Sequence, residues 1–205
     1  MDKVNDVYII DDDKPARESL ALLLRTCGLQ ATTFESGHDF LEAVSQLKAG
    51  CIILDVRMPD ISGLSLHEML LKQNIPFPVI FVTAHGDVRM AVETMASGAF
   101  YFLTKPYREQ EIIDKVQDAL LRESGRLHYE AVYHEKEESI SLLTNREKEV
   151  IELISVGLPN KAIAYKLGIS ERTIEVHRSN MMKKVEVNNV AELINWYAEI
   201  KSHIK

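Results

Sequence analysis

The first 120 residues alternate short apolar runs with segments of helical periodicity, and this alternation limits the fold more than any other feature of the chain. Five runs rich in Val, Ile and Phe are too short for helical periodicity, so we expect them to be strands. The repeat is typical of a parallel sheet with crossover helices. The expected strands are 7–10, 31–34, 51–54, 78–82 and 99–103, and the expected helices are 15–27, 37–47, 64–73, 88–97 and 109–121.

Residues that favour helix starts stand before several expected helices. Pro15 suits a first helical turn, and Ser36 and Asp87 occupy N-cap positions. Residues 144–147, Thr-Asn-Arg-Glu, form a capping box before an apolar stripe, and Ser170 precedes a further helical segment. Helix starts are therefore expected on both sides of residue 120.

The pattern changes after residue 121. Residues 122–141 are highly charged and contain Gly125, so we expect a partly helical linker there. Residues 142–205 contain no strand signals, and their short helical segments include 161–167 and 171–185, joined by a tight turn that contains a glycine. The chain is thus expected to hold an α/β domain over 4–121, a linker over 122–141 and a small all-α four-helix domain with a helix-turn-helix over 142–205.

Composition excludes several classes of protein. With 205 residues, 46% hydrophobic and 27% charged, the chain has ordinary globular composition and is neither disordered nor fibrous. Its 2 cysteines fit a reducing cytoplasm rather than a disulfide scaffold. No apolar run approaches the roughly 20 residues that span a bilayer. We therefore expect a cytoplasmic protein that has no membrane partner.

Charge is distributed unevenly along the chain. Residues 1–120 hold 11 Lys and Arg against 18 Asp and Glu, whereas residues 160–184 hold six bases and two acids. A local basic patch of this kind favours contact with nucleic acid, although a solvated helix face has the same composition.

Polar residues stand at the ends of the expected strands. Asp11 and Asp12 follow the first strand, Asp55 ends the third, Thr83 ends the fourth and Lys105 follows the fifth. We expect the strand order 2-1-3-4-5, in which strands one and three are neighbours and their carboxylates converge. Converging carboxylates repel, and their oxygens suit Mg²⁺, for which Mn²⁺ is a substitute. Asp55 is then the candidate nucleophile toward a phosphoryl group, with Lys105 and Thr83 binding its oxygens.

These residues belong to motifs that resemble the receiver domain of two-component response regulators, of the FixJ-type subgroup. The motifs are residues 9–13, 54–63, 83–87 and 105–106, within a flavodoxin-like domain. The resemblance implies that Asp55 accepts phosphate from a sensor histidine kinase, and that the backbone carbonyl of Arg57 joins the aspartates as a metal ligand. It also implies that Thr83 and Phe102 form a switch pair, although Phe102 also fits as a plain core aromatic. Tyr107 stands where the subgroup usually has Phe.

The segment 171–185 divides into two helical faces. Spacing predicts a buried stripe of Ile174, His177, Met181 and Val185, with a structural role for His177. The opposite face combines basic, acidic and apolar side chains, which suits phosphates and base edges in a DNA major groove. Its candidate DNA-binding residues are Arg172, Glu175, Val176, Ser179 and Lys183, flanked by Thr173, Arg178 and Lys184.

This half of the chain resembles the LuxR-type DNA-binding domain, through residues 143–147, 160–164, 170–177 and 191–193. The resemblance implies that the third helix reads bases and that Asn160 and Lys161 contact the DNA backbone. It also implies that the fourth helix pairs two such domains on DNA. Trp196 and Ile200 could supply that contact, and a core position for Trp196 fits equally well.

Together the motifs predict a response regulator that dimerises on phosphorylation of Asp55, binds double-stranded promoter DNA and regulates transcription with RNA polymerase, as an activator in most regulators of this type. The receiver would catalyse only phosphoryl transfer to Asp55 and hydrolysis from it, so the chain is not expected to be a turnover enzyme. An aspartyl phosphatase would need a second Asp two residues after its nucleophile, where this chain has Arg57. The remaining alternative is a constitutive DNA-binding factor that does not depend on phosphorylation.

Overall fold

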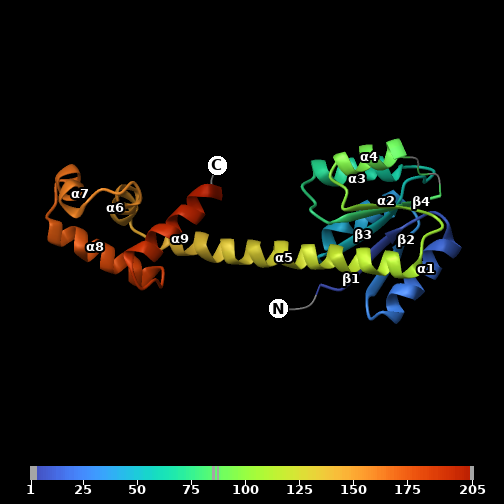
Figure 1. The fold of residues 1–205 in the computed structure, drawn as a ribbon, viewed down its shortest axis with the longest axis horizontal. Helices are drawn as coiled ribbons and strands as arrows, with labels where there is room; N and C mark the ends of the chain where they lie inside the picture. Colours follow the sequence, from blue (N-terminus) through green and yellow to red (C-terminus); the bar gives the residue numbers. More distant parts are fainter. Residues whose placement is uncertain (1–3, 85, 87, 204–205) are drawn as a thin grey trace. The chain divides into compact units, whose positions relative to one another are not determined.

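The computed structural model describes residues 4–84, 86 and 88–203, and it divides the chain into two compact units, Met1–Leu127 and His128–Lys205 (Figure 1). The first unit contains a five-stranded parallel sheet with the order β2-β1-β3-β4-β5, which confirms the predicted order. The strands are β1 (Asp6–Ile10), β2 (Gln30–Phe34), β3 (Gly50–Asp55), β4 (Val79–Thr83) and β5 (Tyr101–Thr104).

Helices cover both faces of this sheet (Figure 1). Successive strand residues face opposite sides, so Ile9 packs into a core cluster with α1 and α5, and Ile10 into a cluster with α2 and α3. The helices are α1 (Lys14–Thr26), α2 (Gly37–Ala43) followed by a 3₁₀ turn at Val44–Gln46, α3 (Gly63–Lys72), α4 (Val88–Ala96) and α5 (Glu109–Ser141). The helix expected over 37–47 thus ends as a 3₁₀ turn.

The predicted helix starts are found where the structure describes them. Pro15 lies in the first turn of α1, and the Ser36 hydroxyl accepts a hydrogen bond from the Asp39 N–H at 3.1 Å. Asp87, which we expected to cap α4, lies outside the described residues. A serine cap of this kind satisfies one of the free N–H groups of the first helical turn.

Helix α5 continues through the segment that we expected to be a partly helical linker. The boundary between the two compact units falls inside it, after Leu127. Glu123 is 1% exposed, and its carboxylate accepts hydrogen bonds from the Arg126 guanidinium at 2.6 and 2.8 Å, which reinforces the helix between these residues. One glycine, Gly125, costs a helix only about 1 kcal/mol and does not end it.

The second unit is a helical domain with its own core. Its helices are α6 (Asn145–Ser155), α7 (Asn160–Leu167), α8 (Glu171–Lys184) and α9 (Val190–His203), and each contributes buried residues to one cluster. Gly168 ends α7 with φ +67°, a left-handed conformation that favours glycine, and Ser170 begins α8 by accepting from the Thr173 N–H. This tight turn joins α7 to α8, the two helices of the predicted helix-turn-helix.

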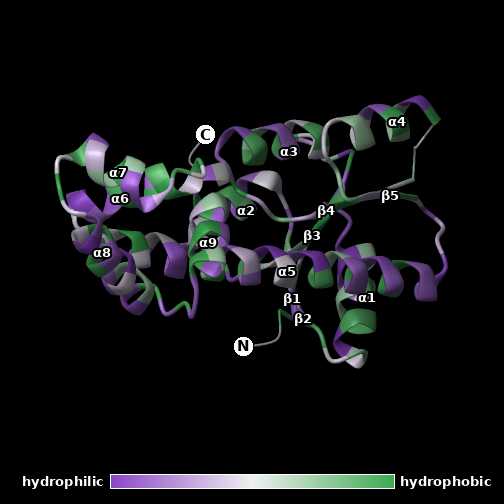
Figure 2. Cartoon of the chain, turned by 60° about the vertical axis from the view of Figure 1, so that its left-hand side comes forward, coloured by the Kyte–Doolittle hydropathy of each residue, from purple (hydrophilic) through white to green (hydrophobic). Residues whose placement is uncertain are grey.

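The helices of both units are amphipathic. The helices in Figure 2 carry hydrophilic as well as hydrophobic residues. In the part of the chain that the structure describes, no helix has the length and the apolar character that a membrane span requires.

Candidate functional site

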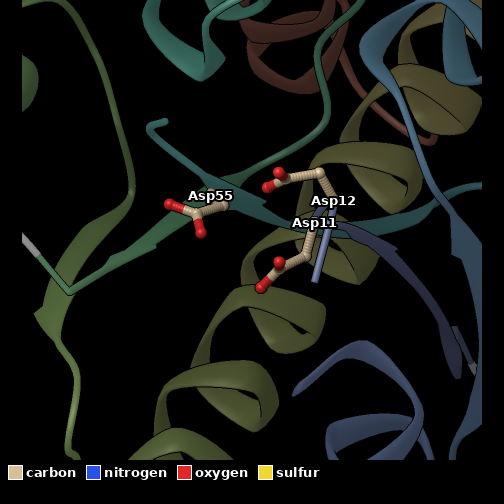
Figure 3. A group of neighbouring side chains, drawn as sticks. All are labelled: Asp11, Asp12 and Asp55. Carbon is tan, nitrogen blue, oxygen red and sulfur yellow. The ribbon is translucent and has the colours of Figure 1, made fainter. Parts of the chain in front are cut away.

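Three carboxylates meet where two neighbouring strands end. Since β1 and β3 are adjacent, Asp11 and Asp12 after β1 lie beside Asp55 at the end of β3 (Figure 3). One carboxylate oxygen from each lies within 4.8 Å of the others. Asp11 is buried at 7% exposure and Asp12 is exposed, so the cluster opens to solvent on one side. This all-oxygen set could hold a metal ion, which would offset the mutual repulsion of the carboxylates.

Lys105 supplies positive charge to the same cluster. Its Nζ donates to Asp11 Oδ2 at 2.7 Å and to Asp55 Oδ2 at 3.1 Å. Burial alone would lower the pKa of Lys105, but the hydrogen bonds and charges of Asp11 and Asp55 outweigh it and raise the pKa above its ordinary value. The ammonium therefore stays charged next to the two carboxylates, where it could also bind an incoming anion.

Backbone groups orient two of the carboxylates. The Arg57 N–H donates to Asp55 Oδ1 at 3.2 Å, which places this peptide beside the cluster. The Asp13 N–H donates to Asp11 Oδ1 at 2.9 Å, while the Asp13 side chain accepts from the Ala16 N–H and so caps α1. No role was predicted for Asp13, although an acid just before Lys-Pro is a recognisable cap signal.

Gly63 allows the loop after Asp55 to close. A Cβ at Gly63 would lie 2.1 Å from the Asp55 carbonyl oxygen, so only glycine fits without moving the backbone. Gly63 belongs to the motif 54–63, but the sequence alone does not reveal this close approach.

The predicted switch residues lie on one face of the sheet. Thr83 is two residues after Phe81, which pairs with Phe102 on the neighbouring strand, and both phenylalanines belong to the cluster under α2 and α3. Thr83 is buried at the end of β4. Phe102 is half-buried, and its ring lies against Gly86, where a Cβ would approach it to 2.8 Å. Tyr107 packs on the opposite core cluster, and burial raises its pKa.

Helix α8 has the two faces that its spacing predicts. Ile174, Met181 and Val185 are buried, and His177 is half-buried. Val176 is 51% exposed and gives this face an apolar contact point. The other exposed residues of the face are Arg172, Glu175, Ser179 and Lys183.

Other candidate DNA-binding residues contact groups inside the domain. The Arg178 guanidinium donates to Asn160 Oδ1, which joins α8 to the start of α7. The Thr173 hydroxyl lies 2.8 Å from the Ser170 hydroxyl, and Lys184 Nζ lies 2.7 Å from Glu147 Oε2. Lys161 is exposed. Only some of the predicted side chains are therefore presented directly to solvent.

Two interpretations of Trp196 were open, a dimer contact or a core position, whereas Ile200 was predicted as a dimer contact. They are 8% and 0% exposed and belong to the core cluster of the second unit. Tyr197, between them in sequence, is also buried, and burial beside Glu152 raises its pKa. The structure places both residues in the core.

Glu147 is a buried polar centre of this domain, and we expect its replacement by glutamine to destabilise the protein. At 3% exposure, its carboxylate accepts hydrogen bonds from the Thr144 N–H, the Thr144 hydroxyl and Lys184 Nζ at 2.7, 2.9 and 2.7 Å. Glu147→Gln keeps the shape but removes the charge, so the free energy of unfolding should fall by about 1–3 kcal/mol. Thermal and urea unfolding followed by circular dichroism measure this loss.

The same substitution has a defined pH dependence. Burial alone would raise the pKa of Glu147, but its bonds to Lys184 and Thr144 outweigh this and lower it. The charged form thus stabilises the fold above the unfolded-state pKa of about 4.3, and this stabilisation is lost as the pH falls through the lower folded value. The difference between wild type and Glu147→Gln should shrink below about pH 4. The control is Glu149→Gln, which removes one charge of an exposed ion pair with Arg146. It should lower the free energy of unfolding by less than about 1 kcal/mol.

Comparison with known proteins gives consistent matches for both units. The family described as "Response regulator receiver domain" matches residues 7–117, and the family "Bacterial regulatory proteins, luxR family" matches residues 141–197. "Response regulator protein TmoT" of Ectopseudomonas mendocina is 38% identical over 100% of this chain and 93% of its own length. "Transcriptional regulatory protein FixJ" of Azorhizobium caulinodans is 45% identical over 92% of this chain and 89% of its own length.

Two solved structures resemble the chain along most of its length. The response regulator StyR has 40% sequence identity and a TM-score of 0.85, covering 95% of this chain and 98% of its own. Full-length FixJ from B. japonicum has 37% identity and a TM-score of 0.60, covering 97% of this chain and 98% of its own. The similarity thus extends over both units.

Proposed function

Because this chain belongs to the two-component response regulators that join a receiver domain to a LuxR-type DNA-binding domain, we propose that phosphorylation of Asp55 controls its binding to promoter DNA. Members of this family regulate transcription and are not turnover enzymes, and their partners are a kinase and DNA. The observation that carries the proposal is the contact of Lys105 with both Asp11 and Asp55 in an acidic cluster that opens to solvent.

The proposed reaction needs one nucleophile and several groups that neutralise charge. An Asp55 oxygen attacks the phosphorus of a phosphohistidine on a sensor kinase, an oxygen–phosphorus bond forms and the phosphorus–nitrogen bond breaks. Without a phosphoryl group, Lys105 Nζ donates to two carboxylates. During the transfer it would instead donate to one phosphoryl oxygen, and the Thr83 hydroxyl would donate to a second phosphoryl oxygen. These contacts stabilise charge that would otherwise oppose transfer.

The donor set of the cluster fits Mg²⁺, with Mn²⁺ as a substitute. We propose that Asp11, Asp12, Asp55 and the backbone carbonyl of Arg57 would hold the ion, because hard divalent cations prefer oxygen ligands. When bound, the ion supplies positive charge that offsets the charge of the phosphoryl oxygens. Asp11 and Asp12 then act only as ligands, and Asp55 as ligand and nucleophile.

The proposed response is a shift between two conformations of the receiver. Movement of Thr83 toward the phosphoryl group would free space behind it for Phe102 on the same sheet face. Helix α4 exposes Val88, Val92 and Met95 at 83%, 62% and 43%, and we propose that this apolar surface, with β5, pairs two receivers. A shift from 1:99 to 99:1 needs about 5.5 kcal/mol of differential stabilisation, part of which dimerisation would supply.

We propose that α8 enters the major groove through its exposed face. Arg172 and Lys183 would bind phosphates or guanine, Glu175 a cytosine amino group and Val176 a thymine methyl group. Lys161 would contact the DNA backbone with Asn160, whose side chain also holds Arg178 in place. Two domains brought together by receiver pairing would bind a two-fold promoter site, where contact with RNA polymerase would activate transcription.

Sedimentation velocity on the full chain tests this coupling. With Mg²⁺ and a small-molecule phosphodonor, we expect a shift from monomer to dimer and tighter binding to promoter DNA, measured on the same samples. Without the donor, both changes should be absent. If the donor modifies the protein but changes neither its sedimentation nor its DNA affinity, the proposal is wrong and the chain is a constitutive DNA-binding factor.

A further inference from the structure

Arg17 is a buried charged residue that the proposed reaction does not use. It lies on the first turns of α1 and is 7% exposed, although arginine is rarely buried without a paired charge. Its guanidinium donates to the backbone carbonyl of Asp11. Over residues 4–84, 86 and 88–203, no carboxylate forms an ion pair with it.

The contact fixes the residue that anchors the acidic cluster. Four hydrogen bonds hold Asp11. Its N–H donates to the Phe34 carbonyl and its own carbonyl accepts from Arg17, while its Oδ1 accepts from the Asp13 N–H and its Oδ2 from Lys105. The carbonyl of Asp11 belongs to the peptide that joins it to Asp12. The bond from Arg17 therefore restrains the main chain from which both carboxylates project.

We propose that Arg17 is a positioning residue for cation binding by Asp11 and Asp12, an inference that rests on the metal site of the proposed function. Groups that orient metal ligands without touching the metal typically account for 10- to 100-fold in metal affinity. Burial suits this role, because a side chain that cannot move holds the peptide in one orientation.

A positioning role and a purely electrostatic role of Arg17 predict opposite changes in cation affinity when the residue is replaced. If Arg17 acted only through its charge, replacing it with a neutral residue would tighten cation binding, because one positive charge near the ligands would be gone. If it orients the Asp11–Asp12 peptide, the same replacement weakens binding. Arg17→Met, which is neutral and of similar length, thus separates the two roles by the direction of the change.

The same helix offers a matched control. Arg25 Nη2 donates to the Ala31 carbonyl at 2.6 Å, which is the same kind of side-chain to backbone bond, also six residues apart in sequence. It contacts β2 rather than the acidic cluster. Arg25→Met should therefore lose a bond of the same kind, made by a more exposed side chain, and leave cation affinity unchanged.

The experiment measures Mn²⁺ and Mg²⁺ binding to the full chain. Free Mn²⁺ is counted by electron paramagnetic resonance, Mg²⁺ binding is followed by calorimetry, and circular dichroism confirms folding of each variant. We expect Arg17→Met to bind both ions about 10- to 100-fold more weakly than wild type, Arg17→Lys to recover part of the affinity, and Arg25→Met to bind as wild type does.

Each outcome decides the question. Equal or tighter binding by Arg17→Met overturns the positioning role, and so does an equal loss in Arg25→Met, which would indicate a general effect of α1 stability. If Arg17→Met does not fold, unchanged affinity in Arg17→Lys overturns it. If wild type binds neither ion, the proposed metal site itself fails and the inference with it, whereas binding by wild type with no effect at Arg17 leaves that site intact.

Discussion

Replacing Asp55 by asparagine should abolish phosphoryl incorporation completely. An amide oxygen is a much weaker nucleophile than a carboxylate, so no acyl phosphate forms when the side chain is Asn. The fold should survive, because the amide has the same shape and can still accept a hydrogen bond from Lys105, and because one repelling carboxylate is removed. Intact-protein mass spectrometry after incubation with Mg²⁺ and a small-molecule phosphodonor should show one added phosphoryl group on wild type and none on Asp55→Asn.

Asp114→Asn is the matched control for this experiment. It makes the same substitution at an exposed carboxylate on α5, which accepts a hydrogen bond from Gln110 and lies outside the acidic cluster. This variant should accept phosphate as wild type does, and it should dimerise when phosphorylated. Undiminished incorporation in Asp55→Asn would instead place the acceptor on another residue and remove the basis of the proposed function.

Local pattern predicted the sheet well because each strand is a short apolar run between polar segments. The order of the strands and their parallel pairing agree with the prediction. The observed strand boundaries differ from the predicted ones where backbone hydrogen bonds, rather than apolar character, decide where a strand begins or ends. The last strand was expected over 99–103 but runs over Tyr101–Thr104, because the Ala99 N–H still donates to the Thr94 carbonyl of α4.

The full length of α5 could not be predicted from its sequence. Residues 122–141 carry many charged side chains, and their apolar residues are too few to form a continuous helical stripe. Charged residues such as Glu, Lys and Arg nevertheless have high helix propensity, and the bonds between Glu123 and Arg126 support the backbone between them. Composition alone does not separate a solvated helix from a solvated loop.

The acidic cluster was predictable because its members stand at strand ends, whereas the residues that orient them were not. Arg17 has the spacing of an ordinary α1 residue, and only the folded chain brings its guanidinium to the Asp11 carbonyl. The contact of Lys184 could not be predicted from the sequence either. Helical spacing places it on the flank of α8, but packing brings it to Glu147, 37 residues away in sequence. Spacing within one helix cannot reveal partners on another.

Val176→Glu should strongly weaken specific DNA binding. The valine is 51% exposed and lies on the exposed face of α8, between Arg172 and Lys183 in sequence. A carboxylate there would lose the proposed thymine-methyl contact and meet the acceptor-rich floor of the major groove and the phosphates around it. We expect promoter affinity to fall by at least about 10- to 100-fold, which corresponds to about 1–3 kcal/mol. Fluorescence anisotropy with labelled promoter DNA at fixed salt measures it.

Val156→Glu separates this local effect from a change of net charge. Val156 is 71% exposed at the end of α6, so its replacement adds the same negative charge to the same domain without touching α8. Both variants should lose the same small amount of non-specific affinity, since that binding depends on charge rather than on sequence. Only Val176→Glu should also lose discrimination between promoter and random DNA. If the two variants lose specific binding equally, α8 does not read the bases, and the exposed face of this helix is a solvated surface.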